Sequence, residues 1–172
     1  SPPKIFEYEI IRADYLDGTT HGGAALINSR QIKHSPLSSI RSSNIQSAST
    51  TLKINSVLIS ISSCYFPPGI TFPTPELIIL LQSFNHSYII GTDFNAKHQT
   101  WSRSTNTRDR AFHNLITQKH LKVLTSPTLT YWLSHAKHYP NTIDFFISSM
   151  PNCFITYITN LNDSALPQFY FI

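Results

Sequence analysis

The sequence is a succession of short apolar runs, rich in β-branched and aromatic residues and separated by Ser, Thr, Asn, Gly and Pro. Runs of this length and composition predict β-strands rather than helices. A chain made mainly of short strands buries its apolar side chains by packing sheets against each other or against helices. We expect strands at Phe6–Arg12, Ala24–Asn28, Ile45–Ile54, Val57–Tyr65, Tyr88–Thr92, Lys122–Leu124, Thr130–Leu133, Ile143–Ile147, Cys153–Ile158 and Phe169–Ile172.

Two segments carry helical signals instead. Thr74-Pro75-Glu76 offers a capping residue, a proline for the first helical position and an early acid, and an apolar run to Phe84 follows. The second predicted helix runs from Asp109, its expected cap, to Lys119. Strands that look mostly antiparallel, with two helices between them, predict an α/β sandwich in which packed β-sheets are flanked by helices.

Composition indicates one domain, spanning residues 1–172, because 41% of the residues are hydrophobic. The net charge of +4 permits a polyanionic partner without requiring one. Cys64 and Cys153 stand alone in apolar runs, so we expect buried thiols and a reducing, intracellular setting. We expect no membrane partner, since no apolar run is long enough to span a bilayer and no secretion signal opens the chain. The chain begins without Met and ends on an apolar run, which suggests a piece of a longer protein.

The most informative polar residues follow the predicted strand Tyr88–Thr92. Asp93 and Asn95 are two residues apart, so an extended backbone places them on the same side. An acid in this position can activate water or hold Mg²⁺, and an amide can donate to a phosphate oxygen. Asp and Asn are also common turn formers after any strand. From these residues alone, both interpretations stay open.

Two further residues stand out in predicted strands. Tyr65 closes Val57–Tyr65 before a stiff proline loop and could reach a phosphate, although aromatic residues at strand ends often pack at the rim of a core. Asp144 lies in the otherwise apolar run Ile143–Ile147, where a charge requires a partner. It could serve catalysis or tie a loop through hydrogen bonds.

Taken in order, these motifs resemble the endonuclease/exonuclease/phosphatase family. The likeness covers about Tyr8 to Pro167 and is strongest for the apurinic-endonuclease-like domains of jockey-type non-LTR retrotransposons. The residues that carry it are Tyr65-Phe66-Pro67-Pro68, the run Gly91–His98 with Trp101 beyond it, and Pro140–Ile147, with support from His21–Ile27 and Ser126–Trp132.

The resemblance implies a four-layer α/β sandwich that hydrolyses phosphodiester bonds with Mg²⁺. By that resemblance Tyr65 would contact the scissile phosphate, and Asp93 would activate the water and bind the metal. Asn95 would stabilise the phosphate, and Asp144 would orient a catalytic histidine. A basic, aromatic-containing stretch beside the site would contact DNA, and its members are Lys97, His98, Trp101, Arg103, Asn106 and Arg108.

The family also suggests a cellular role. In such elements the domain nicks chromosomal DNA in the nucleus to prime reverse transcription. A reverse transcriptase would follow it in the same polypeptide.

Two departures from the family bear on catalysis. The family's first strands carry an Asn and a metal-binding Glu and would precede the first matching residues, so we expect an N-terminally truncated domain. Near the other end the family has Ser-Asp-His-x-Pro, where this chain reads Asn162-Asp163-Ser164-Ala165-Leu166-Pro167. Either Ser164 and Ala165 replace the Asp and the His, or Asp163 keeps the metal-binding acid and the His is lost. Both alignments lack the histidine.

Three functions therefore stay open. The first is a Mg²⁺-dependent DNA endonuclease domain that is inactive in this chain. The second, favoured by the lost histidine, is a relic or co-opted module of the same fold that binds nucleic acid without cutting it. The third is a phosphatase or phospholipase of the same fold, which is disfavoured because Ala96-Lys97-His98 and Trp101 resemble the mobile-element branch.

Overall fold

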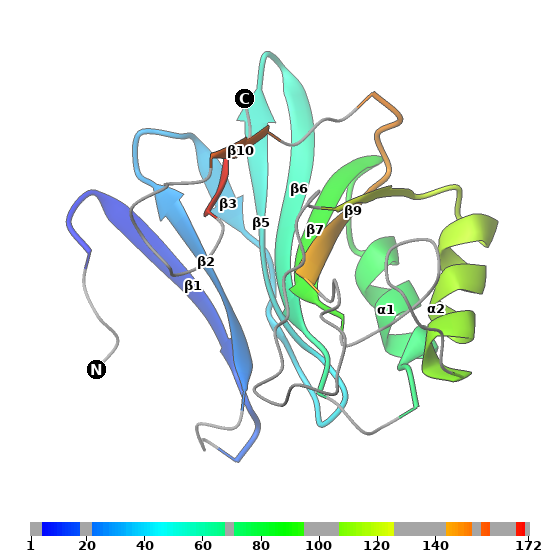
Figure 1. Ribbon diagram of the computed structural model, residues 1–172. Coiled ribbons are helices and arrows are strands. Elements are labelled where there is room, and N and C mark those ends of the chain that lie inside the picture. The colour runs from blue at the N-terminus through cyan, green and yellow to red at the C-terminus, as the bar shows by residue number, and fades with distance from the viewer. Residues whose placement is uncertain are drawn as a thin grey trace.

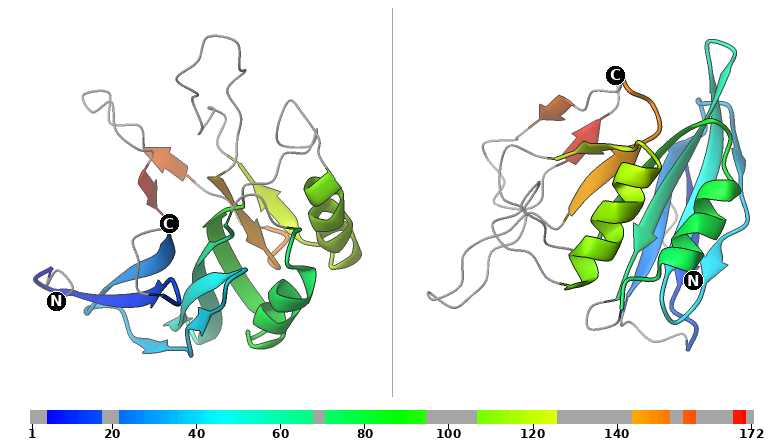
Figure 2. Two further views of the ribbon diagram at one scale, coloured as in Figure 1. Left: turned by 90° about the horizontal axis from the view of Figure 1, so that it is seen from below. Right: turned by 90° about the vertical axis from the view of Figure 1, so that its right-hand side faces the viewer.

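The computed structural model describes residues 5–17, 22–67, 71–94, 107–125, 144–152, 156–158 and 168–170. These residues form three layers, in which a seven-stranded sheet lies between a two-stranded sheet and two helices (Figure 1). Both helices lie over the same face of the large sheet (Figure 2). The predicted α/β sandwich is confirmed, with three of the four implied layers present in the described part of the chain. None of the helices in this part is both long and apolar enough to cross a membrane.

The large sheet has the strand order β3-β5-β6-β7-β9-β8, and β4 pairs with β5 beside β3. Its neighbouring strands are antiparallel except β6 and β7, which are parallel. Its strands are β3 (His34–Pro36), β4 (Ile40–Arg41), β5 (Gln46–Ile54), β6 (Val57–Tyr65), β7 (Ser87–Asp93), β8 (Lys122–Leu124) and β9 (Asp144–Ser148).

Two antiparallel pairs complete the strands. They are β1 (Tyr8–Asp14) with β2 (Gly23–Ser29), and β10 (Thr156–Ile158) with β11 (Gln168–Tyr170). Every predicted strand that falls on described residues is present, and most ends are shifted by one or two residues. The prediction of Thr130–Leu133 lies outside the described residues. Strands β3 and β4 were not predicted, because strands this short show no readable alternation.

The helices are α1 (Thr74–Gln82) and α2 (Thr107–Gln118). The predicted caps are wrong for both. Thr74 is the first residue of α1, Pro73 holds the cap position, and no side chain caps the helix. Pro75 has no N–H to be capped, and the Leu77 N–H bonds the Pro73 carbonyl at 3.0 Å. Asp109 lies within the first turn of α2 rather than before it.

A thin layer of small side chains joins the two-stranded sheet to the large one. Its buried members are Ile11, Ala13, Ala24 and Ala48, with Leu26 and Tyr65 packed beside them. Alanines in this layer allow the two sheets to approach closely, so the end of β2 lies against Tyr65. The position of the candidate site therefore depends on this contact.

An ion pair links the same two sheets at their other end. His34 Nε2 lies 3.0 Å from Glu9 Oε2, and His34 Nδ1 lies 2.7 Å from the Ile32 carbonyl oxygen. The bond to the Ile32 carbonyl and the nearby Glu9 carboxylate raise the pKa of His34 above its ordinary value, against a smaller opposing effect of burial. This link should therefore depend on pH.

A buried hydroxyl cluster lies on the face of β5 and β6 that the helices cover. Ser47, Ser49 and Ser62 are mutually hydrogen-bonded at 2.8 to 3.0 Å, and Ser62 Oγ lies 3.3 Å from Cys64 Sγ. Burial raises the pKa of Cys64 to about 11, which confirms the predicted buried thiol at this position. Cys153 lies outside the described residues.

Candidate active site

Strand pairing brings three predicted site residues together at the same end of three neighbouring strands of the large sheet. Tyr65 at the end of β6 is the register partner of Asp93 at the end of the parallel strand β7. Asp93 is in turn the partner of Asp144, the first residue of the antiparallel strand β9. Residues separated by 28 and 51 positions in sequence thus occupy consecutive places across three strands.

A buried phenylalanine follows each of these residues and fixes the strand ends from the opposite face. Phe66, Phe94 and Phe145 are each at most 1% exposed. The Phe94 ring centroid lies 5.5 Å from that of Phe66 and 4.4 Å from that of Phe145. Tyr65, Asp93 and Asp144 occupy the backbone positions that alternate with this aromatic layer along their strands. The sequence pairs Tyr-Phe, Asp-Phe and Asp-Phe each combine one site residue with its anchor in the core.

Two glycines leave room for aromatic rings around the site. A Cβ atom on Gly91 would lie 2.4 Å from Cε1 of Phe146, and one on Gly22 would lie 2.2 Å from Cε1 of Tyr65. Contacts this short do not occur between real side chains. The absence of a side chain at Gly22 therefore helps to determine where the Tyr65 ring can lie.

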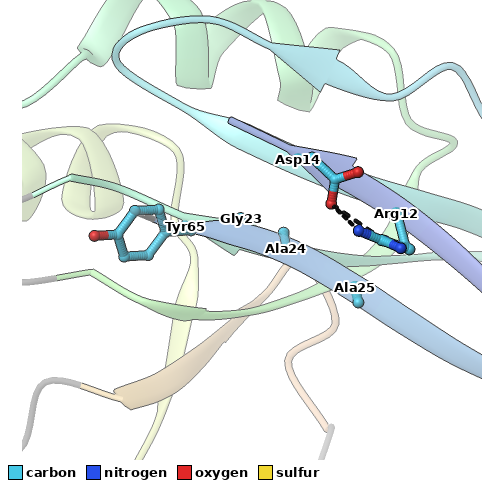
Figure 3. A pocket seen from close by; sticks show the side chains of 7 residues that line it. Arg12, Asp14, Gly23, Ala24, Ala25 and Tyr65 are labelled. Carbon is cyan, nitrogen blue, oxygen red and sulfur yellow. Dashed lines mark hydrogen bonds and ion pairs between the residues drawn. The ribbon is translucent and has the colours of Figure 1, made fainter. Parts of the chain in front are cut away.

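A pocket of about 380 Å³ opens beside Tyr65 at the end of the two-stranded sheet, lined by Arg12, Asp14, Gly22, Gly23, Ala24, Ala25 and Tyr65. Arg12 donates to Asp14 Oδ1 from Nη2 at 2.7 Å and from Nε at 3.1 Å. Figure 3 shows this ion pair on β1, with the Tyr65 ring beyond Gly23 and its hydroxyl directed away from the pair. The pocket thus places a fixed donor and acceptor on one side of the tyrosine.

Of the other predicted site residues, the structure describes only Arg108. Asn95, Lys97, His98, Trp101, Arg103, Asn106 and Asp163 lie outside the described residues. Arg108 lies in the first turn of α2, so it belongs to a helix rather than to a loop.

Four residues near the site were missed by the sequence analysis. They are Arg12, Asp14, Arg41 and Gln46, which lie on β1, β4 and β5. The predicted strand ended at Arg12, whereas β1 continues to Asp14 and places these two charged residues on one face. For Arg41 and Gln46 the sequence offers no signal, since only the strand register relates them to Tyr65.

The acidic residues at this end of the strands are of the type that binds a hard divalent cation such as Mg²⁺. Carboxylate oxygens are the protein ligands that Mg²⁺ prefers. Asp93 and Asp144 are direct register partners, and like charges opposite each other destabilise a sheet unless a counter-charge is supplied. A cation bound beside Asp93 would supply that charge.

The architecture is found in solved structures of nucleases and phosphatases. The endonuclease domain of TRAS1, a telomere-specific non-LTR retrotransposon, matches with a TM-score of 0.68 and 17% identity, over 83% of this chain and 67% of that one. An endonuclease/exonuclease/phosphatase family protein from Leptotrichia buccalis matches with a TM-score of 0.55 and 17% identity, over 90% of this chain and 65% of that one. The chain therefore has the endonuclease/exonuclease/phosphatase fold.

The family follows from the sequence match. The chain belongs to the endonuclease-reverse transcriptase family, whose model matches residues 59–164. It is 28% identical over 148 residues to a probable RNA-directed DNA polymerase from transposon X-element of Drosophila melanogaster, covering 85% of this chain and 16% of that protein. It is 25% identical over 142 residues to the RNA-directed DNA polymerase from mobile element jockey of the same species, covering 82% and 16%. The chain thus spans about one sixth of the length of these relatives.

Proposed function

We propose that this chain is the DNA endonuclease domain of a non-LTR retrotransposon polyprotein. Its site would act on a DNA phosphodiester with Mg²⁺, and the nick would prime reverse transcription in the nucleus. A reverse transcriptase domain would belong to the same polypeptide, as the names of the matched relatives suggest.

The observation that carries this proposal is the row formed by Tyr65, Asp93 and Asp144 across β6, β7 and β9. A phenol at the first position donates a hydrogen bond to a phosphate oxygen. A carboxylate at the second orients the attacking water and accepts its proton. A bound Mg²⁺ would neutralise the charge that develops on the phosphate, and Asp93 of this row, together with Asp163, would hold it.

We further propose that the isolated chain does not cut DNA. The family's histidine is replaced at Ala165 or lost beside Asp163, so Asp144 has no imidazole to orient. General acid–base groups contribute about 10²- to 10⁴-fold to a rate, and the chain lacks this one. The second candidate function, a nucleic-acid-binding module that does not cut, rests on the same missing histidine.

A supercoiled-plasmid assay with Mg²⁺ or with EDTA, combined with DNA binding measured by fluorescence anisotropy, tests both proposals. We expect the chain to bind duplex DNA without nicking it. A version with Ala165→His, extended by the family's leading strands, should nick only with Mg²⁺, and Asp93→Asn should abolish that activity.

The possible outcomes separate the claims. If the unmodified chain nicks DNA and Asp93→Asn abolishes that nicking, the proposed inactivity is refuted and the endonuclease assignment stands. Binding without nicking by the restored version would favour the non-catalytic module. A complete lack of DNA binding would refute both functions.

A further inference from the structure

The row of site residues continues beyond Tyr65 toward the edge of the large sheet. Gln46 on β5 is the register partner of Tyr65, and Arg41 on β4 is the partner of Gln46. In the neighbouring register row, Ile40 packs on the core beneath the helices and Ser47 belongs to the buried hydroxyl cluster. Since side chains alternate along a strand, Arg41 and Gln46 belong to the opposite face, the one that carries Tyr65. The full row reads Arg41, Gln46, Tyr65, Asp93, Asp144.

Arg41 is an exposed cation that no carboxylate neutralises within the described residues. Its Nη2 donates to the Arg12 backbone carbonyl at 3.3 Å, which directs the guanidinium toward the two-stranded sheet and leaves its other donors available. Arg12 differs in this respect, because Asp14 neutralises it. Among the residues that the structure describes, Arg41 is therefore a cation near Tyr65 that is suited to an anionic ligand.

The turn between β4 and β5 holds Arg41 in position. The Ser42 hydroxyl accepts from the backbone N–H groups of Asn44 and Ile45 at 3.2 and 3.1 Å. Asn44 Nδ2 donates to Glu76 Oε1 at 2.8 Å, which ties the turn to α1. Gln46 Nε2 donates to the Ser42 carbonyl. A cation fixed in this way loses less conformational entropy when it binds a ligand.

Gln46 occupies the place between Arg41 and Tyr65. It is fully buried, and its Oε1 has no hydrogen-bond partner in the described residues. A buried side chain cannot touch a large substrate directly, so any contact along this stretch is made at Tyr65 and at Arg41. Two strand spacings separate these positions, a distance of about 10 Å. An interval of this length is short enough for one DNA strand to contact both positions.

We propose that Arg41 binds a backbone phosphate of the DNA strand whose scissile phosphate lies at Tyr65. The strand then runs along the row from Asp144 toward Arg41, and Gln46 is a positioning residue that fixes the turn behind the arginine. This inference rests on the proposed function, because it assumes DNA at Tyr65. It adds the path of the bound strand and a second anchoring point.

The salt dependence of DNA binding tests this assignment, because each phosphate contact contributes about 0.9 to the slope of log K against log salt concentration for duplex DNA. Arg30 supplies a matched control. It is also exposed and donates from Nε to a β1 carbonyl, that of Tyr8 at 3.4 Å, but it follows the end of β2 remote from Tyr65. Arg41→Gln should reduce the slope by about 0.9, Arg41→Lys should preserve it, and Arg30→Gln should leave it unchanged.

Oligonucleotides shortened from either end test this path. Shortening the strand on one side of its centre should abolish the difference between the wild-type chain and Arg41→Gln, whereas shortening it on the other side should not. Equal slopes for Arg41→Gln and Arg30→Gln, with wild-type binding intact, would overturn the Arg41 contact and leave the proposed function standing. A wild-type chain that shows no salt-dependent DNA binding would overturn both. Thermal unfolding of each variant shows whether a changed slope accompanies a loss of folding.

Discussion

Gly91 offers a sharp test of how the site is packed. A methyl group at this position would lie 2.4 Å from Cε1 and 2.8 Å from Cδ1 of Phe146, whereas ordinary contacts begin at 3.4 Å. The Phe146 ring would have to retreat by about 1 Å, the difference between 3.4 and 2.4 Å. Overpacking of this kind costs about 1–3 kcal/mol.

Chain entropy acts in the opposite direction. The backbone at Gly91 has no positive φ, so alanine fits its conformation. Replacing glycine by alanine at such a position stabilises a protein by about 0.4–1 kcal/mol through the unfolded state. The clash is the larger effect, so Gly91→Ala should lower the free energy of unfolding by about 1–2 kcal/mol.

Without the Phe146 ring, Gly91→Ala should stabilise the chain instead of destabilising it. In a Phe146→Ala background the clash is gone, and Gly91→Ala should then stabilise the chain by about 0.4–1 kcal/mol. Chemical denaturation of the four chains of this double-mutant cycle, with unchanged m-values, measures both effects. Equal destabilisation in both backgrounds would show that the cost lies in the backbone, and the packing argument would be refuted.

Three further predictions concern the core, the ion pair and the buried thiol. Phe94→Ala removes the ring that stacks on both neighbouring anchors and should lower the free energy of unfolding by about 3–5 kcal/mol in denaturant titration; a loss below about 1 kcal/mol would contradict the anchoring role. The raised pKa of His34 means that its link to Glu9 stabilises fully below the ordinary value of 6.5 and is lost as the pH rises through the folded-state pKa. Glu9→Gln should therefore lower the melting temperature at pH 5.5 more than at pH 8.5, and an equal effect at both would count against the link. In a Cys153→Ser variant, Cys64 should resist iodoacetamide at pH 8 until the chain unfolds, because its pKa is about 11; rapid labelling of the native chain would contradict its burial.

The sequence by itself indicated the secondary-structure elements and the residues of the candidate site. Periodicity placed the described strands to within a few residues, because an apolar run followed by Gly, Pro or Asn is a local signal that the residues themselves carry. Tyr65, Asp93 and Asp144 were singled out for the same reason, each as a polar residue at or next to the end of an apolar run. Local signals were weaker at helix starts. Thr74 and Asp109 have the character of caps, yet both lie inside their helices.

Only the tertiary structure decided which residues become neighbours. Register across β4, β5, β6, β7 and β9 aligns Arg41 and Gln46 with the predicted residues. Shifting one strand by a single residue would move its side chains to the other face. That register depends on long-range packing, including the aromatic layer around Phe94 and the small side chains between the sheets. The residue types of the proposed site are thus readable from the chain, whereas the row they form, and the cation at its end, exist only in the folded sheet.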